Sequence, residues 1–164
     1  MPDWLRRAGH GTADDGALVT WSVAEGRRGR RWREVVRTGE GIRSSLLLEL
    51  DPQGRFSHLE LSTAAGLLTL HPEGDGTLHG NTVTGRGVEH IEGLPWDQDT
   101  VILVEGSAVC RAAPANDGRR RSVLRIGLDL RFDQGPVPEF LAEADEQRLP
   151  VLGGSENWPL EMED

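Results

Sequence analysis

The sequence contains no lysine, no tyrosine and only one cysteine, Cys110. A single cysteine cannot form an internal disulfide, and its position in an apolar stretch is typical of a small buried side chain. All 18 basic residues are arginine, which we attribute to a GC-rich genome rather than to selection at each position. The composition therefore gives no sign of an oxidising compartment.

Long apolar runs are also missing. No segment approaches the roughly 18 apolar residues of a membrane-spanning helix, and residues 1–7 lack the apolar run of a signal peptide. We therefore expect a cytoplasmic protein with no membrane span. At 164 residues the chain is long enough for one domain with its own hydrophobic core.

The formal net charge of −9 is concentrated at the C-terminal end, where residues 133–164 contain nine acidic residues and one arginine. Nonspecific nucleic-acid binding requires a dominant basic face, so we predict no nucleic-acid partner. We divide the chain into a β domain over residues 1–148 and an acidic tail over residues 149–164. The tail is expected to pack on the domain or to trail from it.

Turn residues recur at short intervals from Asp51 onward, and segments rich in leucine and valine lie between them. This spacing is typical of a β meander or roll. We predict a mainly β single domain: a curved antiparallel sheet forming a spiral β-roll or an incomplete barrel, with one short C-terminal helix over 139–147. The predicted hairpins pair 18–23 with 31–37, 45–50 with 55–61, and 66–71 with 77–84.

Two later segments have the clearest strand patterns. Apolar and polar residues alternate with a period of two over 122–132, and the beginning of 101–113 is apolar on both faces. We predict that these two strands form one long hairpin.

Four of the five histidines lie between residues 58 and 90, interleaved with acidic residues. Imidazole and carboxylate are common metal ligands, but no His-x-His or His-x-Asp pair aims two of them from one face of a strand. The chain also lacks a phosphate-binding loop, a nucleophile elbow and a recognisable Cys–His pair. We therefore assign no metal ligand, no cofactor and no catalytic residue.

The unusual segment Leu78–Asn81 supplies candidate binding residues. His79 and Asn81 would share one face of a strand and could hydrogen-bond hydroxyl groups of a sugar or a lipid head group. The alternative is that Asn81 caps a turn and His79 packs beneath it. Trp32 and Trp96 could offer flat apolar surfaces to an acyl chain, whereas we expect Trp21 to pack in the core.

Several of these segments together resemble the bacterial family of glycolipid-binding proteins. The resemblance implies a spiral β-roll that holds a lipid-like ligand on its concave side. It covers about residues 32–137 and departs from the family pattern after Trp96, where Asp97–Ile102 replaces a Thr-Pro-x-Thr-Asn-like run. The matching segments are Trp32–Arg33, the hairpin Leu46–Leu61, Gly66–Leu70, Leu78–Asn81 and Leu128–Leu130.

We therefore predict noncatalytic binding of a lipid-like or glycolipid ligand on the concave face of the sheet. Two alternatives remain, namely a metal-assisted hydrolase or sugar-modifying enzyme that uses residues 58–92, and a protein-interaction module that acts through the acidic tail. The oligomeric state is not predicted. The expected ligand-binding residues are Trp32, Arg33, His79, Asn81, His90 and Trp96.

Overall fold

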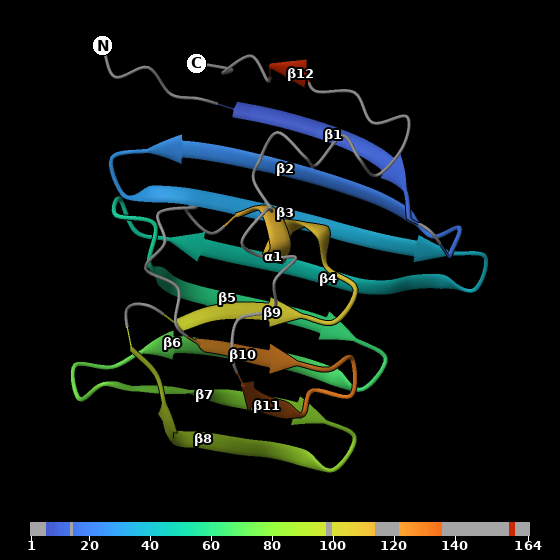
Figure 1. Cartoon of the computed structure of the whole chain (residues 1–164). Helices are drawn as coiled ribbons and strands as arrows, with labels where there is room; N and C mark the ends of the chain where they lie inside the picture. Colours follow the sequence, from blue (N-terminus) through green and yellow to red (C-terminus); the bar gives the residue numbers. More distant parts are fainter. Residues whose placement is uncertain (1–5, 14, 98–99, 114–121, 136–157, 160–164) are drawn as a thin grey trace.

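The protein is a single, mainly β domain built from two sheets (Figure 1). The computed structural model describes residues 6–13, 15–97, 100–113, 122–135 and 158–159. The large sheet has nine antiparallel strands in the order β12-β1-β2-β3-β4-β5-β6-β7-β8, and it is open because β12 and β8 form its two edges. Its strands are β1 (Arg6–Thr12), β2 (Leu18–Gly26), β3 (Gly29–Thr38), β4 (Gly41–Leu50), β5 (Phe56–Thr63), β6 (Gly66–Pro72), β7 (Thr77–Thr84), β8 (Gly87–Pro95) and β12 (Trp158–Pro159).

The small sheet has three strands in the order β11-β10-β9. A short helix, α1, follows β9 and lies between it and β10 in the chain. The bounds are β9 (Thr100–Val104), α1 (Ala108–Ala112), β10 (Ser122–Ile126) and β11 (Phe132–Gly135).

The three hairpins predicted from turn chemistry are confirmed as β2–β3, β4–β5 and β6–β7. The sheet also contains β1 and β8, which the sequence analysis did not assign as strands. From β1 to β8 every strand pairs with its neighbour in the chain, so the large sheet is a meander.

One turn chemistry recurs along one side of this meander. Thr38, Thr63 and Thr84 each precede a two-residue connection, and each hydroxyl oxygen accepts the backbone N–H two residues later at 3.1–3.2 Å. A glycine with φ between 116° and 145° ends each turn. Residues with a side chain rarely adopt this backbone conformation. The pattern Thr-x-x-Gly therefore marks every turn on this side between β3 and β8.

Alternation along the strands separates two faces of the large sheet. We call the face covered by α1 and the small sheet the inner face, and the opposite face the outer face. Figure 1 shows α1 beside β3 and β4, with the small sheet across the later strands. The core joins both layers, and its members include Trp32, Leu48, Leu59, Leu70, Ile102, Val109, Cys110, Leu124 and Ile126.

The predicted long hairpin of 101–113 with 122–132 is wrong. β9 ends at Val104, and the apolar residues that follow form α1, where Ser107 caps the helix by accepting the Cys110 N–H at 3.1 Å. β9 and β10 then pair in parallel. The apparent strand 122–132 is interrupted by a turn at Gly127–Leu130, in which Leu130 has a φ of 65°. The alternating leucines therefore resembled one continuous strand, although the segment is a hairpin of β10 and β11.

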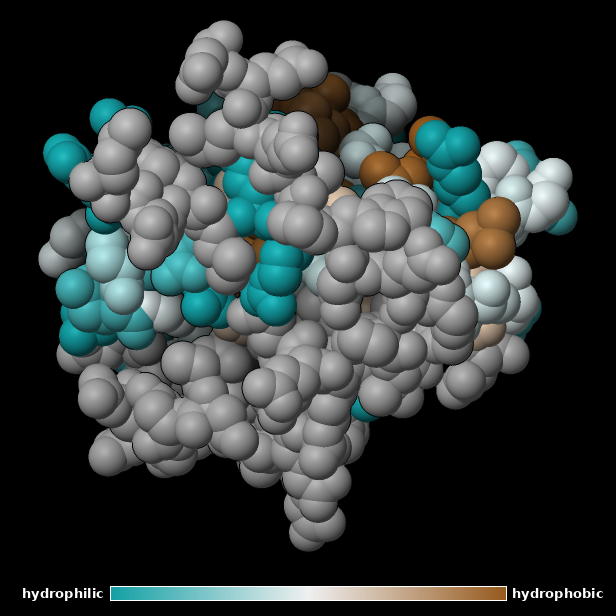
Figure 2. Space-filling model, turned by 90° about the horizontal axis from the view of Figure 1, so that it is seen from above, coloured by the Kyte–Doolittle hydropathy of each residue, from teal (hydrophilic) through white to brown (hydrophobic). Residues whose placement is uncertain are grey.

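Some large apolar side chains lie outside the core, on the surface. Seen from the β1 edge, Figure 2 shows brown apolar side chains interrupted by hydrophilic ones. The most exposed large apolar side chains of the described chain are Leu18, Ile42 and Val88.

The predicted helix over 139–147 lies outside the described residues. Among the described residues, no helix is long and apolar enough to cross a membrane.

Gly80 provides a test of strand packing. A Cβ atom at Gly80 would lie 1.8 Å from the Thr69 carbonyl oxygen, which belongs to the backbone of β6. We expect Gly80→Ala to lower the free energy of unfolding by about 1–3 kcal/mol through overpacking, measured by urea denaturation. Gly85→Ala is the matched control because a Cβ there meets no atom within 4 Å. Equal stabilities of the two variants would contradict this packing.

Candidate functional site

The six residues predicted to bind a ligand lie on both faces of the large sheet. Trp32 is fully buried on the inner face, and Trp96, just after β8, packs against the same core. The other four, Arg33, His79, Asn81 and His90, lie on the outer face. Because the sheet separates the two groups, the six side chains cannot contact one ligand bound on one face. The predicted set therefore divides between the two faces of the sheet.

The four residues on the outer face do not all lie close together. Asn81 and His90 are register partners on β7 and β8, and His90 Nδ1 lies 2.5 Å from Asn81 Oδ1. His79 shares their face, two residues before Asn81. Arg33 lies on β3, which is separated from β7 by three intervening strands. The structure therefore brings His79, Asn81 and His90 together and leaves Arg33 apart.

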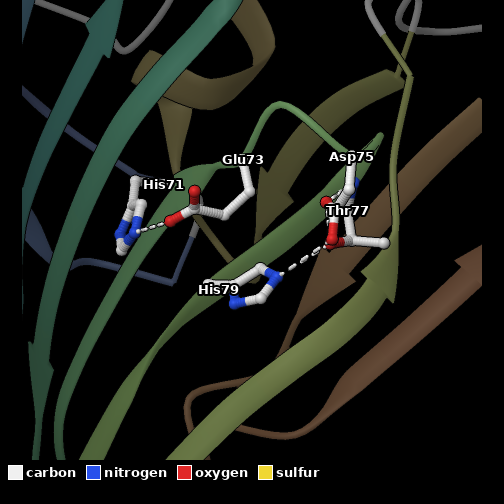
Figure 3. A network of polar contacts seen from close by, with 5 residues as sticks. All are labelled: His71, Glu73, Asp75, Thr77 and His79. Atoms are coloured by element: carbon white, nitrogen blue, oxygen red, sulfur yellow. Dashed lines mark hydrogen bonds and ion pairs between the residues drawn. The ribbon is translucent and has the colours of Figure 1, made fainter.

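The β6–β7 hairpin supplies local partners for its two histidines (Figure 3). The Thr77 hydroxyl donates to Asp75, and this hydrogen bond is the main reason why the pKa of the Asp75 carboxyl lies below its ordinary value. Since that hydroxyl has one proton, it accepts from His79 Nε2, 2.9 Å away. His71 Nε2 contacts Glu73 at 2.9 Å. The His71–Glu73 ion pair is exposed and contributes little to stability.

The histidines do not form a metal centre within the described part of the chain. No group of three or more His, Cys, Asp or Glu side chains there is placed to hold a metal ion. Cys110 is fully buried, and burial raises the pKa of its thiol to about 12. Such a thiol is protonated at neutral pH and is a poor nucleophile or metal ligand.

Aromatic side chains form the most distinctive part of the inner face. Trp21 on β2 and Trp32 on β3 have ring centroids 6.2 Å apart and planes inclined at 39°. Farther across the same core, Phe56 and Trp96 meet edge to face at 6.5 Å. Leu50 is the register partner of Phe56 and belongs to the same cluster. The aromatic residues therefore belong to one continuous apolar core.

Among the described residues, three indole groups in this core have no hydrogen-bond partner. Nε1 of Trp21, Trp32 and Trp96 is buried, and none has an acceptor among the residues that the structure describes. Buried donors are nearly always satisfied, and leaving one unsatisfied costs about 1–3 kcal/mol. These three indole N–H groups are therefore buried donors that the described residues leave unsatisfied.

Glu34 is a buried acidic residue on the same inner face as Trp21 and Trp32. It is the register partner of Trp21 on the inner face and is 2% exposed. Its Oε2 accepts the Val109 N–H at 3.0 Å, so the carboxyl group links β3 to the first turn of α1. Burial raises the pKa of Glu34, and hydrogen bonds from Val109, Ser107 and Ala108 partly offset this effect.

The sequence analysis did not identify the buried Glu34 or the unsatisfied N–H group of Trp21. Trp21 lies in an alternating strand, which correctly predicts a core position but contains no information about its N–H partner. Glu34 occupies a core position between Trp32 and Val36, and a charged residue in an otherwise apolar alternation is the signal that could have identified it.

No family model, no curated protein and no solved structure matches the chain.

The raised pKa of Glu34 predicts a pH-dependent stability. The unfolded carboxyl ionises at a lower pH than the folded one, so the free energy of unfolding falls as pH rises from the ordinary carboxyl range to the folded pKa. We expect Glu34→Gln to remove this part of the pH dependence in denaturation experiments at a series of pH values.

Asp15 supplies a control of opposite sign. Hydrogen bonds from Ala17 and Arg43 lower the pKa of its carboxyl, so its contribution to stability is lost as pH falls. Asp15→Asn should therefore flatten the acid side of the profile and leave the Glu34 component intact. An unchanged pH profile in Glu34→Gln would show that this carboxyl does not titrate as its burial requires.

Proposed function

We propose that the protein binds a lipid-like molecule without catalysis, between the inner face of the large sheet and the layer formed by α1 and the small sheet. The observation that carries this proposal is the set of three buried indole N–H groups that have no acceptor among the described residues. A ligand with oxygen atoms in its polar part would satisfy them while its apolar part contacts the core. Sites for small molecules commonly combine apolar walls with a few polar groups in this way.

The apolar side chains of this core are chemically suited to an acyl chain. The core consists largely of leucine, valine and isoleucine from both layers, with the aromatic rings of Trp21, Trp32 and Phe56. Burial of apolar surface contributes about 25 cal/mol per Å². An acyl chain bound among these side chains would therefore gain affinity along most of its length.

The outer face supports the same ligand class less well. His79 and His90 already contact Thr77 and Asn81. The apolar side chains beside them, Val83 and Val88, are exposed and have no covering layer in the described part of the chain. A glycolipid would therefore place its acyl part on the inner face, with its sugar outside the core.

Titration with cis-parinaric acid, a fluorescent fatty acid, tests the proposal. We expect saturable binding with quenching of tryptophan emission, because Trp21 and Trp32 lie in the proposed site. Trp32→Phe removes one N–H donor and should weaken binding about two- to tenfold, the range that one net hydrogen bond contributes. Isothermal titration calorimetry measures both variants independently of tryptophan emission.

Asn81→Ala is the matched control. Asn81 lies on the outer face, so its loss should leave the affinity for parinaric acid unchanged. Thermal unfolding of each variant confirms that the fold is retained. A titration without saturation would refute the proposal, and an effect of Asn81→Ala as large as that of Trp32→Phe would move the site to the outer face.

A further inference from the structure

The exposed aliphatic side chains of the large sheet gather at one end of its outer face. In each Thr-x-x-Gly turn, the residue that follows the glycine is aliphatic and exposed. Another exposed valine directly precedes Thr84, and Leu18 is the register partner of Arg37, which directly precedes Thr38. We call this end of the outer face the turn rim. Its exposed aliphatic residues, which are the exposed large apolar residues of the described chain, are Leu18, Ile42, Leu67, Val83 and Val88.

Strand register joins most of these side chains into a continuous row. Leu67 pairs with Val83, and Val83 pairs with Val88, so three exposed side chains lie side by side across β6, β7 and β8. The Cβ atoms of directly paired residues lie about 4.5–5.5 Å apart on one face of a sheet. The row is therefore a contiguous aliphatic strip. In Figure 2, brown side chains are visible on the side where these turns lie.

An arginine occupies the corresponding position over the earlier strands. Arg37 is the register partner of Leu18 on β2 and of Ile42 on β4, so it lies between two exposed aliphatic side chains. An arginine in such a position can pack its stem on the aliphatic groups while its guanidinium reaches a polar partner. The planar guanidinium suits the oxygens of a phosphate group.

The remaining charges of the turn rim favour an anionic partner. Arg43 is paired with Asp15 at 2.7 Å, so these two charges compensate each other. Arg86 lies at the tip of the β7–β8 turn, and Glu40 lies at the tip of the β3–β4 turn. On the outer face of the described rim, Arg37 and Arg86 thus outnumber the one unpaired carboxylate, Glu40.

We infer that the turn rim docks on a membrane surface that contains anionic lipids, with its aliphatic side chains among the head groups and its arginines on lipid phosphates. A second copy of the chain fits less well, because a two-fold contact joins the same patch on both copies and would bring the excess arginines together. The inference goes beyond the proposed function and does not depend on it, because docking requires no ligand in the core.

Cosedimentation of the full chain with lipid vesicles tests the inference. We expect binding to vesicles of phosphatidylglycerol and phosphatidylcholine in equal amounts, and weaker binding to phosphatidylcholine alone. Arg37→Gln should weaken binding to the mixed vesicles about fivefold, the contribution of one basic residue near an anionic surface. Arg55→Gln is the matched control, because it removes the same charge from the β4–β5 turn at the opposite end of the sheet.

The double variant Ile42→Gln, Val88→Gln tests the aliphatic contribution. It should weaken binding to both kinds of vesicle at least about fivefold, because two aliphatic side chains no longer leave water on docking. Both side chains are 60% exposed, so thermal unfolding should remain unchanged.

The possible failures are distinct. No binding to the mixed vesicles refutes the inference, and an equal loss of binding in Arg37→Gln and Arg55→Gln would show that overall charge rather than the turn rim is responsible. Analytical ultracentrifugation provides a further check. A dimer that the double variant dissociates, in a protein that does not bind vesicles, would assign the turn rim to a second copy of the chain. Failure of parinaric acid to bind would refute the proposed function and leave membrane docking unaffected.

Discussion

The structure depends on covering one face of an open antiparallel sheet. The strands from β2 to β8 present apolar side chains to the same side. A meander of this kind cannot bury that surface by itself because its edges do not meet. The segment from β9 to β11 covers it with α1 and the small sheet. The core of the protein is therefore the contact between these two layers, and each layer requires the other.

Covering the sheet also determines the chemistry of its inner face. Water is removed from Trp21, Trp32 and Trp96, and their N–H groups become donors that the described chain does not satisfy. The same burial confines Glu34 beside α1, where backbone N–H groups compensate its charge in part. The proposed binding of a lipid-like molecule rests on these buried indole donors.

The parts of the fold that local chemistry encodes could be predicted, and the parts that depend on distant contacts could not. The hairpins β2–β3, β4–β5 and β6–β7 follow from turn residues and alternation, which act over a few positions. The segment after Val104 contains apolar residues compatible with a strand or a helix. It forms a helix because Ser107 caps its N-terminus and Glu34 accepts a backbone N–H from its first turn. β9 and β10 pair in parallel across a long connection, and local spacing cannot indicate that direction.

The sequence by itself determined that this chain forms a meander of short strands, because a period of two and recurrent turn residues are properties of neighbouring positions. It also placed His79 and Asn81 on a common face. Only the tertiary structure decided which face is covered, and it thereby put Trp32 in the core and its neighbour Arg33 on the outside. The physical reason is that alternation separates two faces without distinguishing them, whereas burial beneath a second layer depends on residues far along the chain.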